Sequence, residues 1–406
     1  MTMRLTVGGN NFQISMKLFL FDAIIAVSFI HSLCFCAQER CWQAALPENY
    51  QDTIAAANFG IRPFSTYRLS TDIDLKGCVC VIPENVKIVL AGGYFKNGAL
   101  IGQETQIIGS MVAFDRVRLK GTWRVKKIST DMFRTLDYVN ALADVLALAS
   151  PNEKNEVLIE EGAYALSAST EGENCLSIPC RTKLVVDGEI VVLPNDLQKY
   201  AALYVEGQHV TLSGKGRITG DKDRHRGKKG EWGHGIKMWN VHNVTLTGLT
   251  VSDCWGDCLY IGGESSQVKV FDCIFDNGRR QGISITGGEH VKIWNCVIRN
   301  VGGTAPEYGI DMEPNDGNTV RDIYIRNTQI EKCRGGIMAY GKARNAYVGG
   351  IQVKNCYISG THWHPLAFTS TDDVSVSGCK VKWNVNYDLV LNRESRVVEK
   401  NNRRIE

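Results

Sequence analysis

Five consecutive segments in the second half of the chain decide the fold: GIKMWNVHNVTLTGLTV (235–251), CLYIGGESSQVKVFDCIF (258–275), GISITGGEHVKIWNCVI (282–298), GIDMEPNDGNTVRDIYIRNTQI (309–330) and GIMAYGKARNAYVGGIQVKNCYI (336–358). Successive segments open 23 to 27 residues apart. Each holds two short runs in which apolar and polar residues alternate, separated by Gly, Asn or Asp, a pattern typical of short strands and turns. A repeat of this length with several strands and no helix predicts one coil of a parallel β-helix.

Aligning the segments sorts their residues into columns that stacked coils would bring together. Two apolar columns are expected to face inward: Ile236, Leu259, Ile283, Ile310 and Ile337, then Met238, Ile261, Ile285, Met312 and Ala339. A third column contains Cys273, Cys296, Cys356 and Cys379, with Thr328 in the same place. A buried thiol is a good small apolar group, so we predict that these cysteines are reduced core residues. Two other pairs, Cys78/Cys80 and Cys175/Cys180, are better disulfide candidates.

The composition excludes several classes of protein. The chain has 406 residues, of which 44% are hydrophobic, so it is not a disordered chain. Its 46 basic and 43 acidic residues give a net charge of only +3, which argues against a nucleic-acid partner. Any electrostatic partner must be recognised by local clusters.

The ends of the chain predict its compartment and domains. From Met16, one lysine precedes a largely apolar stretch and then small residues up to Ala37. This is a secretory signal pattern. Asp22 and His31 interrupt the apolar run and argue against the competing reading, a membrane anchor. We therefore expect an exported bacterial protein, periplasmic, cell-surface or extracellular, with no integral membrane domain. The expected parts are a signal peptide (1–37, starting at Met16), a strand-rich region with one capping helix at about 131–148 (38–150), the β-helix (151–390) and a charged tail that frays (391–406).

Polar residues gather at two positions of the repeat that should face outward. Just before the opening residues stand His234, Asp257 and Gln281, with Arg280 one residue earlier. Two residues after the openings stand Lys237, Tyr260 and Asp311, and Glu313 follows Asp311 on the same side. Trp232, Trp239 and Trp255 lie nearby, and a basic insert at 220–233 includes Lys228. Aromatic rings beside carboxylates and guanidinium groups suit a sugar, whose apolar faces stack and whose hydroxyls need polar partners.

The segments VTLSGKGRITGDKDRHRGKKGEW, WGHGIKM, SDCWGDCLYIGG and RRQGISI resemble the pectin-lyase-like superfamily of right-handed parallel β-helices. Within it they look most like the polygalacturonase-type glycoside hydrolases, and the likeness covers roughly residues 155 to 385. The resemblance implies a right-handed coil and a polysaccharide substrate, bound on the outward strand face.

This sequence departs from the hydrolase pattern where the chemistry lies. The family's first aspartate is replaced by His234, and its histidine by Gln281, so that Asp257 alone remains in place. Asp311 and Glu313 occupy the positions of an anion-binding Arg and Lys. The same cleft is expected, with different chemistry.

Three functions stay open, and no cofactor is expected for the first. A hydrolase would use two carboxylates flanking the scissile bond, and Asp311 and Glu313 are about 7 Å apart by strand rise, within the range for inversion. A lyase would use Arg280, Lys237 or His234 as base, with Asp257, Asp311 and Glu313 as ligands of a Ca²⁺ ion. A β-helix that only binds glycan, as a spike or adhesin does, is the third. We favour hydrolysis.

Overall fold

The computed structural model describes residues 2–7, 10–15, 52–168, 174–205, 207–383 and 390–405. The chain divides into two units, Met1–Gln43 and Ala44–Glu406. In the first, β1 (Thr2–Val7) pairs antiparallel with β2 (Asn10–Ser15). The expected signal segment from Met16 to Ala37 lies outside the described residues.

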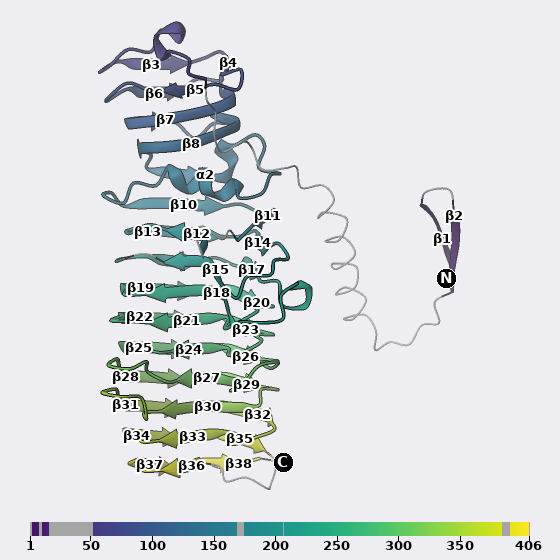
Figure 1. The fold of residues 1–406 in the computed structure, drawn as a ribbon, viewed down its shortest axis with the longest axis vertical. Helices are drawn as coiled ribbons and strands as arrows, with labels where there is room; N and C mark the ends of the chain where they lie inside the picture. Colours follow the sequence, from purple (N-terminus) through teal and green to yellow (C-terminus); the bar gives the residue numbers. More distant parts are fainter. Residues whose placement is uncertain are drawn as a thin grey trace. The chain divides into compact units, whose positions relative to one another are not determined.

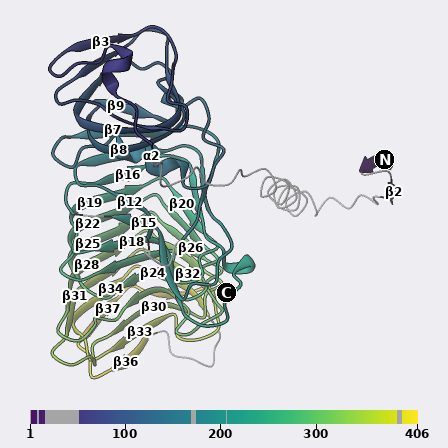
Figure 2. The same cartoon turned by 45° about the horizontal axis from the view of Figure 1, so that its top comes forward.

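The second unit is a stack of coils, and each complete coil contributes one strand to each of three parallel sheets (Figures 1 and 2). The eleven-stranded sheet contains β9 (Lys127–Ser129), β10 (Asn155–Ile159), β13 (Thr182–Val186), β16 (Thr211–Ser213), β19 (His242–Thr247), β22 (Ser266–Phe271), β25 (Gly288–Trp294), β28 (Thr319–Arg326), β31 (Tyr347–Lys354), β34 (Asp372–Ser377) and β37 (Val397–Lys400). The ten-stranded sheet contains β11 (Ala163–Leu166), β14 (Glu189–Val192), β17 (Arg217–Thr219), β20 (Thr250–Ser252), β23 (Ile274–Asp276), β26 (Val297–Arg299), β29 (Gln329–Glu331), β32 (Tyr357–Thr361), β35 (Lys380–Trp383) and β38 (Arg403–Arg404). The nine-stranded sheet contains β12 (Asn174–Ile178), β15 (Lys199–Val205), β18 (Trp232–Trp239), β21 (Leu259–Gly262), β24 (Ile283–Ile285), β27 (Tyr308–Met312), β30 (Gly335–Tyr340), β33 (Leu366–Thr369) and β36 (Val390–Arg393).

The residues of each predicted apolar column are paired with one another on neighbouring strands of the nine-stranded sheet. Ile236 pairs with Leu259, Leu259 with Ile283, and Ile283 with Ile310. These side chains, and those of the second apolar column, are fully buried. The predicted parallel β-helix is therefore confirmed.

The polar turn residues before the cysteine column explain how each coil bends. Asp272, Asn295, Asn327 and Asn355 all have φ between 51° and 55°. Asn and Asp tolerate this left-handed conformation better than other non-glycine residues. The side chains also connect coils, since Asn327 Nδ2 donates to Asn295 Oδ1 at 3.3 Å.

The opening residues decide which side chains face outward. A Cβ added to Gly235, Gly282 or Gly309 would lie within 2.5 Å of a side chain of the ten-stranded sheet. Both the opening residue and the isoleucine after it therefore point into the core, because the chain turns a corner there. The residue before the opening consequently points outward.

The N-terminal region continues the stack. A six-stranded parallel sheet is formed by β3 (Thr66–Leu69), β4 (Ile73–Asp74), β5 (Val79–Val81), β6 (Lys87–Leu90), β7 (Phe95–Ile108) and β8 (Phe114–Arg124). The short 3₁₀ turns are η1 (Ala56–Phe59), η2 (Thr130–Met132) and, in the insert, η3 (Lys222–Arg224). The sheet of the β-helix crosses the expected boundary at residue 150, since β9 pairs with β10.

The capping helix is shorter than predicted. It is α2, Ala141–Ala147, and not 131–148. Phe133 forms a β-bridge to Phe114, and Asn140 has a left-handed φ of 62°, so the helix begins only after it. The helix packs against β8, β11 and β12.

Two further expectations are corrected. Cys78, Cys80 and Cys175 are free thiols, so neither candidate disulfide is present. Cys175 lies on the extended β12 and Cys180 stands two residues beyond the end of this strand, so the chain holds them further apart than the short Cα separation that a disulfide requires. The segment 391–405, expected to fray, completes a last coil whose strands β36, β37 and β38 pair in register with β33, β34 and β35.

Candidate functional site

Outward residues of the nine-stranded sheet form a continuous column. Lys237 pairs with Tyr260, Tyr260 with Ser284, and Ser284 with Asp311. The residues before the openings form a second column through backbone hydrogen bonds, from Gly235 N to the oxygen of Asp257 and from Cys258 N to that of Gln281. The structure thus brings the predicted polar residues onto one strip.

Asp257 is fully buried among His234 and Arg280. The His234 Nδ1 atom accepts from the backbone N–H of Asp257 at 3.4 Å and lies 3.4 Å from its Oδ2 atom. One terminal nitrogen of Arg280 lies 3.4 Å from both carboxyl oxygens of Asp257. Glu231, from the insert, is 3.9 Å from the Arg280 Nε atom. The Arg280 guanidinium therefore lies between the carboxylates of Glu231 and Asp257, which belong to different coils.

Asp311 is also buried, and Gln281 holds it. The Gln281 amide donates to Asp311 Oδ2 at 2.7 Å and accepts from the backbone N–H of Tyr308 at 2.7 Å. The hydrogen bonds of Gln281 explain why this residue is buried at a position that faces outward. Sequence reasoning placed Gln281 at the site as a substrate contact, whereas here it orients a carboxyl group.

Three buried polar atoms of the strip have no hydrogen-bond partner among the described residues: Arg280 Nε, Ser284 Oγ and Asp311 Oδ1. An unpaired buried polar atom is costly, and native proteins have few of them. Ser284 and Asp311 are register partners on adjacent strands. Their unpartnered atoms mark the place where polar groups of a ligand or solvent would be bound.

Burial changes the protonation of this cluster. It raises the pKa of Asp257 to about 7, although Arg280 acts in the opposite direction. It raises the pKa of Asp311 well above its ordinary value, and the neighbouring Glu313 raises it further. Burial also lowers the pKa of His234 to about 3, with Lys237 and Arg280 adding to the effect. The contact of His234 with Asp257 is consequently one between a neutral imidazole and a carboxyl that is half protonated near neutrality.

The other predicted residues surround these carboxyls. Glu313 is half-buried just beyond the end of β27. The Tyr260 ring stacks on His234, with centroids 4.7 Å apart, and on Trp239, at 6.3 Å. The Lys237 ammonium lies 5.9 Å from the Trp239 ring centroid. These aromatic rings form one wall of the strip.

The insert is built around a buried aspartate that sequence reasoning missed. Asp221 accepts from the Tyr200 hydroxyl, from the backbone N–H of Asn195 at 3.0 Å and from the Asn195 amide at 2.9 Å, and it lies 2.9 Å from His225 Nδ1. His225 belongs to the basic insert at 220–233, yet its side chain is fully buried. Asp221 stands at the start of the insert, and this position was the signal in the sequence that could have identified it.

The insert also fixes the tryptophan next to Asp257. The Trp255 ring is stacked between His225, with centroids 3.9 Å apart, and the Arg279 guanidinium, at 3.7 Å. Trp255 is therefore buried, whereas Trp232 is 45% exposed. Lys228 is exposed on the insert, which projects beside β17 and β20 (Figure 1).

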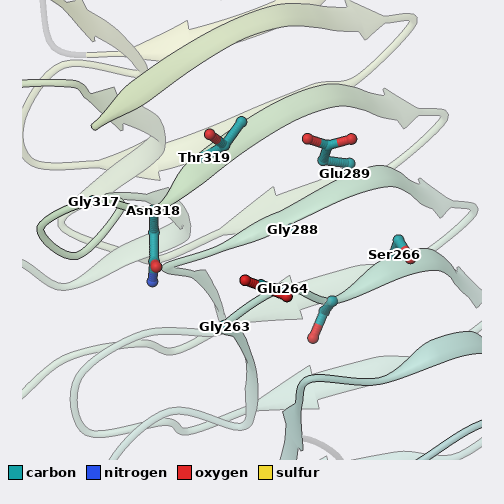
Figure 3. Close-up of a pocket in the computed structure, with 9 residues that line it drawn as sticks. Gly263, Glu264, Ser266, Gly288, Glu289, Gly317, Asn318 and Thr319 are labelled. Carbon is teal, nitrogen blue, oxygen red and sulfur yellow. The ribbon is translucent and has the colours of Figure 1, made fainter. Parts of the chain in front are cut away.

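A separate hollow of about 410 Å³ lies at the other end of these strands. Figure 3 shows its rim, which includes Glu264, Glu289, Asn318 and Thr319. Neither Asp257 nor Asp311 lines it, so it does not mark the carboxyl cluster. Thr286 links the two places, because its backbone oxygen accepts from Asn318 at 3.1 Å and its hydroxyl donates to Tyr260 at 2.7 Å.

Two findings apply only to the described residues. They contain no group of three or more His, Cys, Asp or Glu side chains placed to hold a metal ion. Across the same ranges, no helix combines the length and the apolar character that a membrane crossing requires. The calcium-dependent alternative stays a prediction.

Residues 195–350 match the family described as "Right handed beta helix region". This match covers most of the repeat region and agrees with the three parallel sheets. The right-handed β-helix fold implied by the resemblance to the pectin-lyase-like superfamily is confirmed.

Two proteins of Bacillus subtilis (strain 168) are similar in sequence. The SPbeta prophage-derived uncharacterized protein YorA is 26% identical over 290 residues, which cover 64% of this chain and 48% of YorA. The uncharacterized protein YclG is 30% identical over 206 residues, covering 44% of this chain and 35% of YclG. The chain thus spans about half of the first relative and about a third of the second.

Among solved structures, a polygalacturonase from Erwinia carotovora ssp. carotovora is similar with a TM-score of 0.45 and 13% identity. The match covers 69% of this chain and 92% of that protein.

Proposed function

We propose that this protein is a polysaccharide-processing enzyme that hydrolyses glycosidic bonds at the outward strip of the nine-stranded sheet. The observation that carries the proposal is the convergence of two carboxyls with raised pKa, Asp257 and Asp311, on three buried polar atoms that lack partners. Perturbed carboxyls of this kind cluster at functional sites. The resemblance to polygalacturonase-type hydrolases supports a glycan as the ligand.

In this mechanism Asp311 is the acid, since its raised pKa favours the protonated form. That proton passes to the glycosidic oxygen as its bond to the anomeric carbon breaks. Glu313, half-buried two residues away, takes a proton from a water molecule whose oxygen forms the new bond. The separation of about 7 Å expected from strand rise leaves room for this water and implies inversion.

The remaining residues position the sugar. Arg280 compensates the charge of Asp257 and Asp311, and its Nε, which lies 3.9 Å from the Glu231 carboxylate, has no hydrogen-bond partner of its own. Tyr260 stacks on the buried His234 and on Trp239, and the half-buried Trp239 ring would stack on a sugar. Trp232 and Lys228, both exposed, would contact a longer chain, and Lys228 would favour an acidic one.

Two alternatives have their own supporting observations. The guanidinium of Arg280 beside buried carboxyls supports a lyase, in which a base removes the proton next to a uronate carboxylate. A calcium-dependent form of this lyase would require Asp257, Asp311 and Glu313 to draw together around the ion, because the described residues contain no such group already placed to hold a metal. The similarity to YorA, which is described as prophage-derived, supports a glycan-binding spike without catalysis.

The decisive experiment is incubation with polygalacturonate, alginate, hyaluronate, xyloglucan and galactomannan. Hydrolysis predicts new reducing ends without the ultraviolet absorbance of an unsaturated uronate. We expect Asp311→Asn and Glu313→Gln each to lower the rate by about 10²-fold or more. Glu331→Gln, at the end of β29 on the ten-stranded sheet, is the matched control and should leave the rate unchanged.

Other outcomes identify the alternatives. Unsaturated products that disappear on chelation would indicate the calcium-dependent lyase, and retention without cleavage would indicate the spike. Full activity in both carboxyl variants would remove Asp311 and Glu313 from the mechanism. We further propose export, on the signal pattern that begins at Met16.

A further inference from the structure

A second ladder of side chains extends from the carboxyl site along the stack. Arg280, Glu307, Arg334 and Trp363 each stand three residues before the inward isoleucine or leucine of successive coils. The pairing of Tyr308 with Gly335, and the hydrogen bond from Gly336 N to the His364 oxygen, confirm that these coils are aligned there. Trp363 ends the ladder and is 38% exposed.

Trp363 is held in place by Arg334. The Arg334 guanidinium carbon lies 4.2 Å from the centre of the Trp363 ring, and its Nη1 atom donates to Glu307 at 3.3 Å. The backbone N–H groups of His362 and Trp363 both donate to the Arg334 oxygen, at 3.0 and 2.7 Å. The turn that carries the tryptophan is therefore built on the arginine that stacks against it.

Tyr308 makes this platform continuous with the carboxyl site. Burial raises the pKa of Tyr308 to about 12; nearby Asp311 raises it as well, and Arg334 lowers it. The tyrosine ring lies where a side chain at position 335 would be, since a Cβ on Gly335 would come within 2.1 Å of it. Asp311 and Trp363 belong to coils two apart, roughly 10 Å along the stack. Trp363 also stands four residues before Ala367, the residue of its coil that is aligned with Asp311.

We propose that Trp363 and Arg334 form a distal stacking subsite for the glycan that reaches Asp311. The identity of the ligand rests on the proposed function, whereas the platform rests on the contacts above. A pyranose ring presents an apolar face of C–H groups, which an exposed indole recognises by stacking. Glu307 balances the charge of Arg334, so the subsite recognises the apolar face of the sugar and not a charge. The carboxylate oxygens of Glu307 would accept hydrogen bonds from sugar hydroxyls.

The test measures binding apart from cleavage. Retardation is followed in native gels that contain each of the five polysaccharides named above, in the Asp311→Asn background. We expect Trp363→Ala to weaken binding by about tenfold and Trp363→Phe by less than about threefold, because a smaller aromatic face is kept. Tyr347→Ala is the matched control: this tyrosine is 39% exposed but lies on β31 in the eleven-stranded sheet, and its removal should change nothing.

The outcomes separate this inference from the proposed catalysis. Cleavage by the wild type, with Trp363→Ala and Tyr347→Ala binding equally well, would overturn the subsite and leave the catalytic proposal standing. Loss of retardation in Trp363→Ala, without cleavage by the wild type, would support the subsite and refute catalysis. Failure of all five gels to retard the protein would overturn the inference.

Discussion

At the scale of single residues, His234 and Asp257 form a pair whose pH effects oppose each other. Asp257 has a pKa of about 7 in the folded protein against an ordinary 3.8, so the folded state holds a proton that the unfolded state has lost between these values. Stability from this group is fully present below about 3.8 and falls as pH rises to about 7. His234 has a pKa of about 3 against 6.5, so its contribution is present above 6.5 and is lost as pH falls to about 3.

We therefore expect single substitutions to reveal slopes that the wild type conceals. Asp311 titrates in the wild type and in both variants, so each variant is compared with the wild type at the same pH. Relative to the wild type, Asp257→Asn should lose stability as pH is lowered from about 7 to 4, because it lacks the aspartate whose proton stabilises the folded state at low pH. His234→Gln should lose stability relative to the wild type as pH is raised from about 4 to 6.5, because it lacks the contribution of the neutral histidine. Each slope approaches roughly 1.4 kcal/mol per pH unit. Urea denaturation from pH 4 to 8 measures both, and variants that run parallel to the wild type would contradict the assignment.

At the scale of the strand and its turn, the opening residues determine the orientation of the functional column. A Cβ on Gly282 would lie 2.2 Å from Ile298 Cγ2 and 2.6 Å from the Gly309 oxygen. The chain can thus turn its corner only with a small residue there. This corner is what brings Gln281 outward to meet Asp311.

Gly282→Ala should accordingly destabilise the protein by about 1–3 kcal/mol, as overpacking of a dense core does. Gly302→Ala is the control, because its added Cβ would meet only one atom, Glu307 Oε1, at 3.7 Å; we expect a change below about 0.5 kcal/mol. Thermal or urea unfolding compares the two. Equal effects would mean that the corner has room for a side chain.

At the scale of the whole second unit, the core is one continuous apolar interior that includes thiols. At most 1% of the surface is exposed in each of the four stacked cysteines, Cys273, Cys296, Cys356 and Cys379. Successive coils place Cys296 beside Cys273 and Cys379 beside Cys356. No disulfide joins these four cysteines in the structure, so their thiols serve as apolar packing groups.

Two measurements test this core. Thiol titration of denatured, unreduced protein should find these four cysteines reduced. Cys296→Ser should destabilise by about 1–3 kcal/mol, since it buries a hydroxyl in an apolar stack, whereas Cys78→Ser, at a half-buried position, should cost less. Complete oxidation of the four, or a neutral Cys296→Ser, would refute the packing role.

The sequence by itself determined the coil, its inward columns, its Asn and Asp turns and the outward strip. Stacking converts a repeat in the chain directly into neighbours in space, so Ile236, Leu259 and Ile283 meet because each follows the opening residue of its coil. Only the tertiary structure decided the features that do not repeat. These are the shorter helix α2, the hydrogen bonds around Asp221, the stacking of Arg334 on Trp363, and the burial of Asp257 and Asp311. The physical reason is that the pKa of a carboxyl depends on which groups exclude water from it. Those groups, among them Arg280, Gln281 and Glu313, come from different coils and loops whose side-chain positions no periodicity specifies.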